Sequence, residues 1–359
     1  MLGLSEDHQR RGVVTASAGN HALALAYHAR QLGVPCTCVM PTVAPLTKVS
    51  RCHSFGAKVL QAGEHIGEAR TFANTLVESE GLTYINGFDD PAIIAGAGSM
   101  AIEMLEQAPG LSAIVVPVGG GGLIAGIATV VKTLAPHVLV VGVEPATCPS
   151  LTAAMEAGMP VAVPYTSTLA DGLAVPQMGG NAYEICAQLV DKVVTVSECS
   201  IALSVLRLLE HRNTLIEGGG AAGFAALLDK DLLPELRGKK VCVPLCGGNI
   251  DISTVSRVIE RGLAADGRLV RFVVTVSDRP GGIARLSEVV HRVGASFKDI
   301  HHERAWVQTD LFAVQVHCVV ETTGPEHLAK LRAALEEAGY PLLWDFQQPT
   351  APSIPFPRS

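Results

Sequence analysis

The feature that most constrains this chain is the alternation of short, uninterrupted apolar runs with segments of helical periodicity. A strand that is apolar at every position is buried on both faces, as in parallel sheets covered by helices on each side. The pattern therefore predicts an α/β fold built on doubly wound parallel sheets. The predicted strands cover residues 12–17, 36–40, 59–60, 113–118, 138–144 and 240–245.

A second pattern begins near residue 268. Strand-like segments at 270–276, 298–305 and 312–321 enclose a helical pattern at 282–294, and another helix is predicted at 325–339. This order predicts a small ferredoxin-like unit. Glycines near 262–267 predict a linker before it. The predicted domains are 1–108, 109–262 and 268–346, followed by a Pro- and Ser-rich tail, 347–359, that is expected to be disordered.

Charge and hydropathy exclude several classes of partner. The formal net charge is −7, and the chain has no dense run of Lys or Arg, so nucleic acid and anionic membranes are not expected as partners. Residues 111–131 carry no charge and are long enough to span a bilayer. They contain Pro117 and four consecutive glycines, which are poor in a helix interior, so a buried strand, loop and helix are predicted instead.

The cysteines favour a reducing compartment. The nine cysteines are an odd number without a C-x-x-C pair, and no apolar leader follows Leu4. We therefore expect free thiols and a cytoplasmic location. Cys36 and Cys38 fall in one predicted strand, and their side chains are expected to point to opposite faces of it.

The first candidate ligand motif is the run from Ser17 to His21, SAGNH, between a predicted strand and a predicted helix. The first N–H groups of a helix attract anions, and the Asn20 side chain offers both a donor and an acceptor. Ser and Asn also favour ordinary N-caps. Taken alone, the motif fits a helix cap as well as a ligand loop.

The second motif is four consecutive glycines after the strand at 113–118: Gly119, Gly120, Gly121 and Gly122. Without Cβ atoms, the backbone can approach an oxygen-rich ligand closely, and the helix that follows adds its positive end. The pattern predicts a phosphate-binding loop, with a merely flexible loop as the alternative. It is not G-x-G-x-x-G and no Walker lysine follows, which disfavours dinucleotides and nucleoside triphosphates.

The third motif, Cys246 to Asn249 (CGGN), follows the last strand of the parallel set. Ligands of parallel sheets gather outside the carboxyl ends of the strands. Cys246 is either a buried structural thiol or a weak, neutral partner for a ring nitrogen. Glu217, which precedes three glycines, is either a first-turn charge of a helix or a site carboxylate.

Together these motifs resemble the threonine/serine dehydratase branch of the fold-type II, tryptophan synthase β-like, pyridoxal-phosphate enzymes. The resemblance runs from Leu4 to Arg261. Its matching segments are SAGNH, MPTVAPLTKV (40–49), FGAKV (55–59), FDDP (88–91), GAGSMAIE (96–103), VPVGGGGL (116–123), GVEP (142–145), ADGLAV (170–175), EGGGAAG (217–223) and CGGN.

The resemblance implies pyridoxal 5'-phosphate as cofactor and assigns residues to it. Asn20 would bond the phenolic oxygen, Gly119 to Gly122 would hold the phosphate, and Cys246 would face the pyridine nitrogen. The substrate carboxylate pocket would be lined by Ser17, Gly19 and His21. No metal site is assigned.

The implied reaction converts L-threonine to 2-oxobutanoate and ammonia, or L-serine to pyruvate and ammonia, in amino-acid catabolism or isoleucine biosynthesis. Residues 1–108 and 109–262 would be the small and large domains of the core. Residues 268 to about 343 resemble an ACT domain, with a first turn at 277–282. ACT domains commonly bind a small amino-acid effector, often at a dimer interface, so a homo-oligomer is expected. An inert oligomerisation domain is the alternative.

One element of the family pattern is missing. The family carries its Schiff-base lysine in a Ser-Phe-Lys-x-Arg-Gly-Ala motif upstream of SAGNH, whereas this chain opens at Met1 and Leu2. Lys48, the nearest lysine, matches a different family position. We therefore expect a fold that is incomplete at its N-terminus and a chain that is inactive as it stands.

Three functions remain open from the sequence. The first is an ammonia-lyase of which this sequence is an incomplete form. The second is a catalytically inactive isoform that binds amino acids through its ACT domain or assembles with full-length subunits. The third is a serine racemase, which is disfavoured because racemases that resemble this family carry a serine where this chain has Ala18, and alanine has no proton to give.

Overall fold

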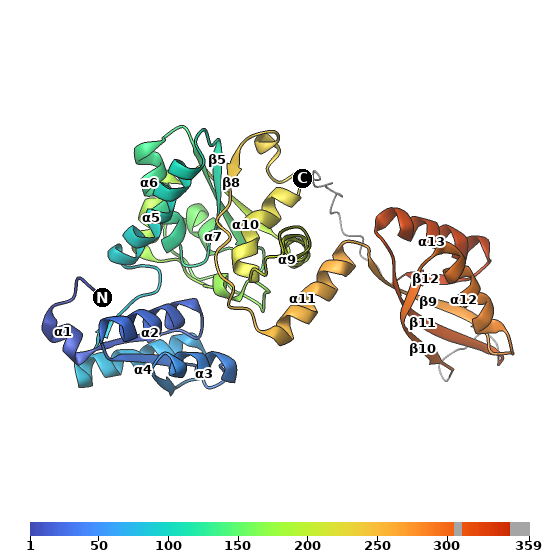
Figure 1. Ribbon diagram of the computed structural model, residues 1–359, viewed down its shortest axis with the longest axis horizontal. Coiled ribbons are helices and arrows are strands. Elements are labelled where there is room, and N and C mark those ends of the chain that lie inside the picture. Colours follow the sequence, from blue (N-terminus) through green and yellow to red (C-terminus); the bar gives the residue numbers. More distant parts are fainter. Residues whose placement is uncertain (305–310, 345–359) are drawn as a thin grey trace. The chain divides into compact units, whose positions relative to one another are not determined.

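The computed structural model describes residues 1–304 and 311–344, and the chain divides into two compact units (Figure 1). The core unit consists of Met1–Glu198, Leu215–Leu227 and Asp231–Asp251. The C-terminal unit consists of Cys199–Thr214, Leu228–Lys230 and the residues from Ile252 onward. The predicted tail, 347–359, lies outside the described residues.

The first sheet of the core unit is parallel, with strand order β3-β2-β1-β4. Its central strands are apolar and buried at nearly every position, because helices cover both faces. Residues such as Val13 and Met40 pack against α2 and α3, whereas Val14 and Val39 pack against α4. The elements are α1 (Glu6–Arg11), β1 (Val13–Ala16), α2 (Asn20–Leu32), β2 (Cys36–Met40), α3 (Leu46–Ser54), β3 (Lys58–Gln61), α4 (Ile66–Glu80) and β4 (Thr83–Tyr84).

The prediction that Cys36 and Cys38 point to opposite faces of their strand is wrong. Their sulfur atoms are 3.9 Å apart, and both side chains lie in the core beneath α2 and α3. Side chains alternate along a strand with a period of two, so residues i and i+2 share a face. Cys52 of α3 joins the same buried cluster.

This burial predicts which thiols react in the folded protein. Iodoacetamide should modify Cys199 first, since it is the exposed thiol in the described part of the chain. Cys186 and Cys318 should be protected, because burial raises the pKa of each to about 12 and the thiolate is the reactive form. Mass spectrometry of tryptic peptides after brief labelling would measure this order. Labelling of Cys186 or Cys318 as fast as Cys199 would contradict it.

The second sheet of the core unit is also parallel, with strand order β7-β6-β5-β8. One face packs against α5, α6, α7 and α8. The uncharged segment 111–131 forms β5, a loop and most of α6, and no helix of the described residues is long and apolar enough to cross a membrane. The elements are α5 (Pro91–Gln107), β5 (Ala113–Pro117), α6 (Gly122–Leu134), β6 (Leu139–Pro145), α7 (Ser150–Ala157), α8 (Gly180–Leu189), β7 (Lys192–Val196), α10 (Gly218–Leu228) and β8 (Val241–Cys242), with short 3-10 turns at Asp171–Leu173 and Pro234–Leu236.

These two parallel sheets confirm the predicted α/β fold class. Two details differ from the sequence-based expectation. β8 is an edge strand that pairs with β5 at only two positions, so it is shorter than the predicted 240–245. β7 is not among the predicted strands, although its run from Val193 to Val196 carries β-branched residues.

The C-terminal unit contains an antiparallel sheet of order β10-β11-β9-β12. Alternate residues of β9 and β11 are buried under α12 and α13, with Phe272, Leu286 and Leu331 at the centre of the core. This order is the predicted ferredoxin-like arrangement; that the unit is an ACT domain stays a prediction. The elements are α9 (Glu198–Arg212), α11 (Ile252–Ala265), β9 (Leu269–Ser277), α12 (Gly282–Val293), β10 (Ser296–Glu303), β11 (Ala313–Glu321), α13 (Pro325–Glu337) and β12 (Leu342–Trp344).

The linker predicted at 262–267 is mostly helical, since α11 continues to Ala265. Gly262 is required for helix packing, not for flexibility. A Cβ atom at this position would lie 2.9 Å from the Cβ atom of Leu206 in α9. The glycine therefore lets α11 approach α9 closely.

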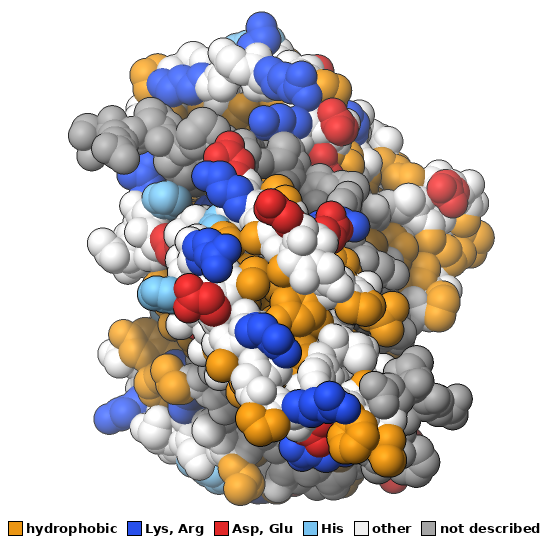
Figure 2. Space-filling view, turned by 90° about the vertical axis from the view of Figure 1, so that its right-hand side faces the viewer, with side chains coloured by type: hydrophobic (Ala, Val, Ile, Leu, Met, Phe, Trp, Pro, Cys, Tyr) orange, Lys and Arg blue, Asp and Glu red, His pale blue; other side chains and the backbone are white. Residues whose placement is uncertain are grey.

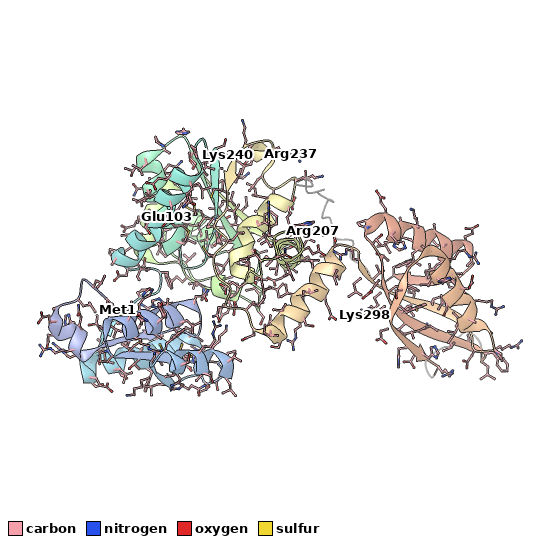
Figure 3. All side chains as sticks on the ribbon, viewed as in Figure 1. Met1, Glu103, Arg207, Arg237, Lys240 and Lys298 are labelled. Atoms are coloured by element: carbon pink, nitrogen blue, oxygen red, sulfur yellow. The ribbon has the colours of Figure 1, made fainter. Side chains whose placement is uncertain are left out.

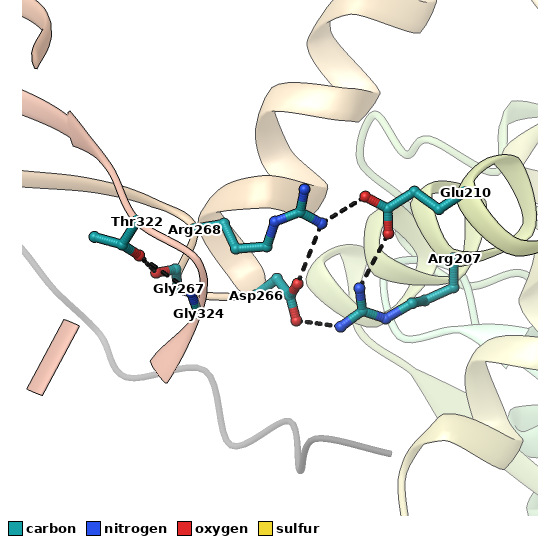
Figure 4. A network of polar contacts seen from close by, with 7 residues as sticks. All are labelled: Arg207, Glu210, Asp266, Gly267, Arg268, Thr322 and Gly324. Carbon is teal, nitrogen blue, oxygen red and sulfur yellow. Dashed lines mark hydrogen bonds and ion pairs between the residues drawn. The ribbon is translucent and has the colours of Figure 1, made fainter. Parts of the chain in front are cut away.

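Four charged side chains join α9 and α11 to the start of β9 (Figure 4). Arg207 and Arg268 each contact both Glu210 and Asp266. Burial alone would raise the pKa of Glu210, but the hydrogen bonds and charges of Arg268 and Arg207 outweigh it and lower that pKa. Each charge thus has two opposite charges beside it, a geometry that contributes more than an isolated surface pair.

Charges elsewhere on the surface are mixed. In the view of Figure 2, basic and acidic side chains are interspersed with hydrophobic ones. Lys298 of β10, labelled in Figure 3, pairs with Glu260 of α11 at 2.7 Å.

Candidate cofactor site

The glycine loop places a row of backbone N–H groups at the start of α6. Gly121 is the N-cap of this helix, with φ of 93°, and no side chain caps it. In the described part of the chain, the N–H groups of residues 119–124 donate to no protein acceptor. Free amides at the positive end of a 13-residue helix suit a phosphate group.

The glycines of this loop are needed because other parts of the protein approach them closely. A Cβ atom at Gly120 would lie 2.3 Å from the ring of Phe88, and one at Gly122 would lie 2.2 Å from the Phe88 carbonyl oxygen. On another side, a Cβ atom at Gly121 would lie 2.4 Å from Cε of Met178. Phe88 and Met178 therefore fix the loop, a supporting role that sequence reasoning missed.

The SAGNH motif lies at the start of α2, and none of its polar side chains caps that helix. The N-cap is Gly19, without a side-chain cap bond, and Ser17 Oγ instead accepts from the Gly19 N–H at 3.2 Å. Asn20 is exposed, and its Nδ2 donates to Glu217 Oε1 at 2.6 Å. The N-cap alternative for Asn20 is therefore wrong, and its amide lies beside a carboxylate from a distant part of the chain.

The ring of His21 is hydrogen-bonded within the protein. Its Nε2 donates to the carbonyl oxygen of Ile85 at 3.1 Å, and a Cβ atom at Gly87 would lie 3.0 Å from its ring. Burial lowers the pKa of His21, although the bond to Ile85 works the other way, so the ring is neutral at neutral pH. The substrate-carboxylate role of Ser17, Gly19 and His21 stays a prediction.

Glu217 connects the predicted cofactor contacts. Its side chain is buried, and besides Asn20 it accepts from the Asn249 N–H through Oε2 at 3.1 Å. Its own N–H donates to the Gly247 carbonyl oxygen at 3.1 Å. Gly247 has φ of 86°, and a Cβ atom there would lie 2.2 Å from Glu217 Oε1. The CGGN loop thus rests directly on this carboxylate.

The remaining contacts bring the three motifs together. A Cβ atom at Gly220 would lie 1.6 Å from the Cys246 carbonyl oxygen, so the CGGN loop touches α10. A Cβ atom at Gly119 would lie 3.1 Å from Cα of Leu173, and one at Gly172 would lie 3.8 Å from Glu217 Oε1. The glycine loop, Asn20 and Cys246 therefore surround one region at the carboxyl ends of the strands.

This set of donors fits a planar, phosphorylated ring. The free amides at 119–124 suit the phosphate, and the exposed Asn20 amide has a second N–H to offer. Burial raises the pKa of Cys246, and the charge of Glu217 raises it further, so its thiol is neutral at neutral pH. Across residues 1–304 and 311–344, no group of three or more His, Cys, Asp or Glu side chains is arranged to hold a metal ion.

Helix α3 makes three polar contacts with the loops around this region. Lys48 Nζ lies 3.0 Å from Asp171 Oδ2, and Thr47 Oγ1 donates to Asp251 Oδ1 at 2.9 Å. Arg51 donates to the side-chain oxygen of Asn249 at 2.5 Å. Sequence reasoning missed these contacts, because nothing in a single sequence pairs α3 with residues more than 100 positions away.

Comparison with known proteins agrees with this geometry. Residues 1–247 match the family model described as "Pyridoxal-phosphate dependent enzyme". An L-threonine ammonia-lyase of Geobacter sulfurreducens is 43% identical over 330 residues, which cover 92% of this chain and 82% of the relative.

Solved structures are similar as well. The processed form of threonine deaminase isoform 2 from Solanum lycopersicum is 34% identical with a TM-score of 0.69, over 72% of this chain and 76% of that one. Maize serine racemase is 30% identical with a TM-score of 0.68, over 73% of this chain and 80% of that one. From its motifs, its two parallel sheets and these relatives, the chain belongs to the pyridoxal-phosphate dependent enzyme family, in the threonine/serine dehydratase branch.

Proposed function

We propose that this chain carries the core of a cytoplasmic ammonia-lyase that converts L-threonine to 2-oxobutanoate and ammonia, and L-serine to pyruvate and ammonia. The observation that carries the proposal is the bond from Asn20 to Glu217, which joins the SAGNH and CGGN motifs around one region. The similarity to the threonine ammonia-lyase of Geobacter sulfurreducens supports threonine as substrate. The nine free cysteines suit a reducing cytoplasm.

Different residues of the site bind different parts of the cofactor. Amides of Gly119 to Gly122 bind the phosphate, and a side-chain N–H of Asn20 bonds the phenolic oxygen. Cys246 offers the ring nitrogen a neutral thiol, a weak donor that leaves the nitrogen unprotonated and favours β-elimination over transamination. When bound, pyridoxal phosphate would delocalise the electron pair left on the α-carbon of the substrate after its α-proton is removed.

Ala18 of the SAGNH motif disfavours racemisation. A racemase needs a proton donor on the face opposite its lysine, and Ala18 has no proton to give. The structural likeness to maize serine racemase concerns the fold that both chains share.

The 359-residue chain alone should not turn over threonine. All nine of its lysines are among the described residues. Lys48 is the lysine beside the site loops, and it pairs with Asp171. Lys240, labelled in Figure 3, precedes β8 and donates to Pro109 at the opposite ends of the strands. With pyridoxal phosphate and L-threonine, 2-oxobutanoate should stay at the level of a blank without protein.

Extending the chain tests the whole proposal. We expect turnover when an upstream segment with the Ser-Phe-Lys-x-Arg-Gly-Ala motif of the family precedes Met1, and none when alanine replaces the lysine of that segment. The Geobacter sulfurreducens relative serves as positive control. Turnover by the unextended chain, with borohydride trapping of the cofactor on Lys48, would refute the predicted inactivity. An extended chain that binds cofactor but leaves threonine unchanged would refute the proposed reaction.

As a second function, we propose that the C-terminal unit binds a small amino-acid effector and joins copies of the chain into a homo-oligomer. The ferredoxin-like strand order of β9 to β12 favours an ACT-type unit of this kind. An isoform without catalytic activity could still act through this unit.

A further inference from the structure

The carboxylate of Glu217 is almost fully enclosed by protein groups. Its exposed fraction is 8%, and both of its oxygen atoms are engaged, Oε1 with Asn20 and Oε2 with the Asn249 N–H. Gly247 allows this enclosure, since any larger residue would collide with Oε1. No element of the proposed reaction uses the carboxylate directly.

The side-chain amide of Asn20, which bonds this carboxylate, has two chemically different atoms. The amide of Asn20 carries an oxygen that only accepts and a nitrogen that donates two hydrogen bonds. An ionised carboxylate only accepts, so it favours the orientation in which the nitrogen faces Glu217. The second N–H of the same nitrogen then remains for a ligand, and Asn20 is an exposed residue.

We propose that Glu217 is a positioning residue: its ionised carboxylate fixes the amide of Asn20 with a donor toward the phenolic oxygen of pyridoxal phosphate. The inference rests on the proposed function, because it needs the cofactor at this site. Without the carboxylate, the amide can turn over and present its oxygen to another oxygen. A charge-assisted bond of this kind is stronger than a neutral one.

Two charged side chains, Asp171 and Lys48, and two hydrogen bonds act on Glu217. Burial raises its pKa most, and Asp171 raises it further, whereas the bonds from Asn20 and Asn249 and the charge of Lys48 lower it. Cys246 is a further titratable group here; burial and the charge of Glu217 raise its pKa, so its thiol stays protonated at neutral pH. Since the folded pKa of Glu217 is raised, cofactor binding should weaken as pH falls through it, at a higher pH than for an ordinary glutamate.

Equilibrium dialysis of pyridoxal phosphate against the purified chain tests this idea without any turnover. At neutral pH, Glu217→Gln should weaken binding roughly tenfold, as expected for the loss of one charge-assisted bond. The variant should also lose the acidic step of the pH profile that belongs to Glu217. Titration of the cofactor itself is common to both proteins and cancels in the comparison. Circular dichroism checks that the variant is folded.

Two more variants separate positioning from a merely structural role. In an Asn20→Ala background, Glu217→Gln should have no further effect on affinity, because the amide that it orients is gone. Asp171→Asn should retain the neutral-pH affinity but move the acidic step to lower pH, since it removes a charge that raises the pKa of Glu217. The shift of the acidic step in Asp171→Asn can be measured even if the Glu217→Gln variant does not fold.

The possible results distinguish a failure of the positioning role of Glu217 from a failure of the proposed function. Wild-type binding with an unchanged profile in Glu217→Gln, or additive effects of the two substitutions, would overturn the inference alone. A wild-type chain that takes up no cofactor at any pH would overturn the proposed function and the inference with it. Loss of the acidic step together with non-additivity supports the positioning role.

Discussion

Replacing Gly220 by alanine should destabilise the core unit by about 3 kcal/mol or more, toward the upper end of overpacking effects. Gly220 lies in the first turn of α10, and the new Cβ atom would lie 1.6 Å from the Cys246 carbonyl oxygen. The atom in the way belongs to the backbone, so no side-chain rotation relieves the collision. The CGGN loop must move away from α10, and cofactor affinity should fall with it.

Urea unfolding followed by far-ultraviolet circular dichroism measures this cost. The matched control is Gly96→Ala in α5, where a Cβ atom would meet nothing within 4 Å. Alanine there should be neutral or stabilise by about 0.5–1 kcal/mol, because glycine is the poorer helix former. Equal unfolding midpoints for the two variants would show that the loop does not rest on α10 as described.

Phe272→Ala should destabilise the C-terminal unit by about 3–5 kcal/mol, the range for removing a buried aromatic side chain. Phe272 lies in β9 with an exposed fraction of 0%, between Cys318 of β11 and Trp344 of β12. Its ring centroid is 5.2 Å from that of Trp344. A cavity at this point removes contacts from both neighbouring strands and from the helices beneath.

Tryptophan emission reports this loss selectively, because both tryptophans of the chain, Trp306 and Trp344, lie in its C-terminal part. Guanidinium unfolding followed by emission should show an earlier midpoint for Phe272→Ala. The control is Leu343→Ala in β12, whose side chain is 68% exposed, and its effect should stay within about 0.5 kcal/mol. A large effect of Leu343→Ala, or none of Phe272→Ala, would contradict the described core.

Local patterns were enough to predict the fold class. The strand predicted at 36–40 occurs at these residues, because its apolar run marks a strand buried on both faces. Apolar runs report burial but not the length of pairing, which explains why β8 is shorter than predicted. Gly262 was misread as a linker residue, since a glycine needed for helix packing looks the same in sequence as a flexible one.

The candidate site was predictable only in part. The three motifs follow strands of parallel sheets, whose carboxyl ends gather ligands, so their convergence could be expected. Their cofactor contacts stay predictions. The bond between Asn20 and Glu217 joins residues 197 positions apart, and neither residue type signals the other. Phe88 was likewise missed, because its role is to fill the space left by glycines of another loop.

The C-terminal unit is not a continuous stretch of chain. Its first segment, Cys199–Thr214, contains most of α9 and precedes two segments of the core unit in the sequence. Its other segments are Leu228–Lys230 and the residues from Ile252 onward. A single protease cut after Asp251 would therefore release a fragment without α9 and without Arg207 and Glu210 opposite Asp266 and Arg268. Exchange of this end between homologous enzymes, in evolution or in the laboratory, would have to carry α9 along with it.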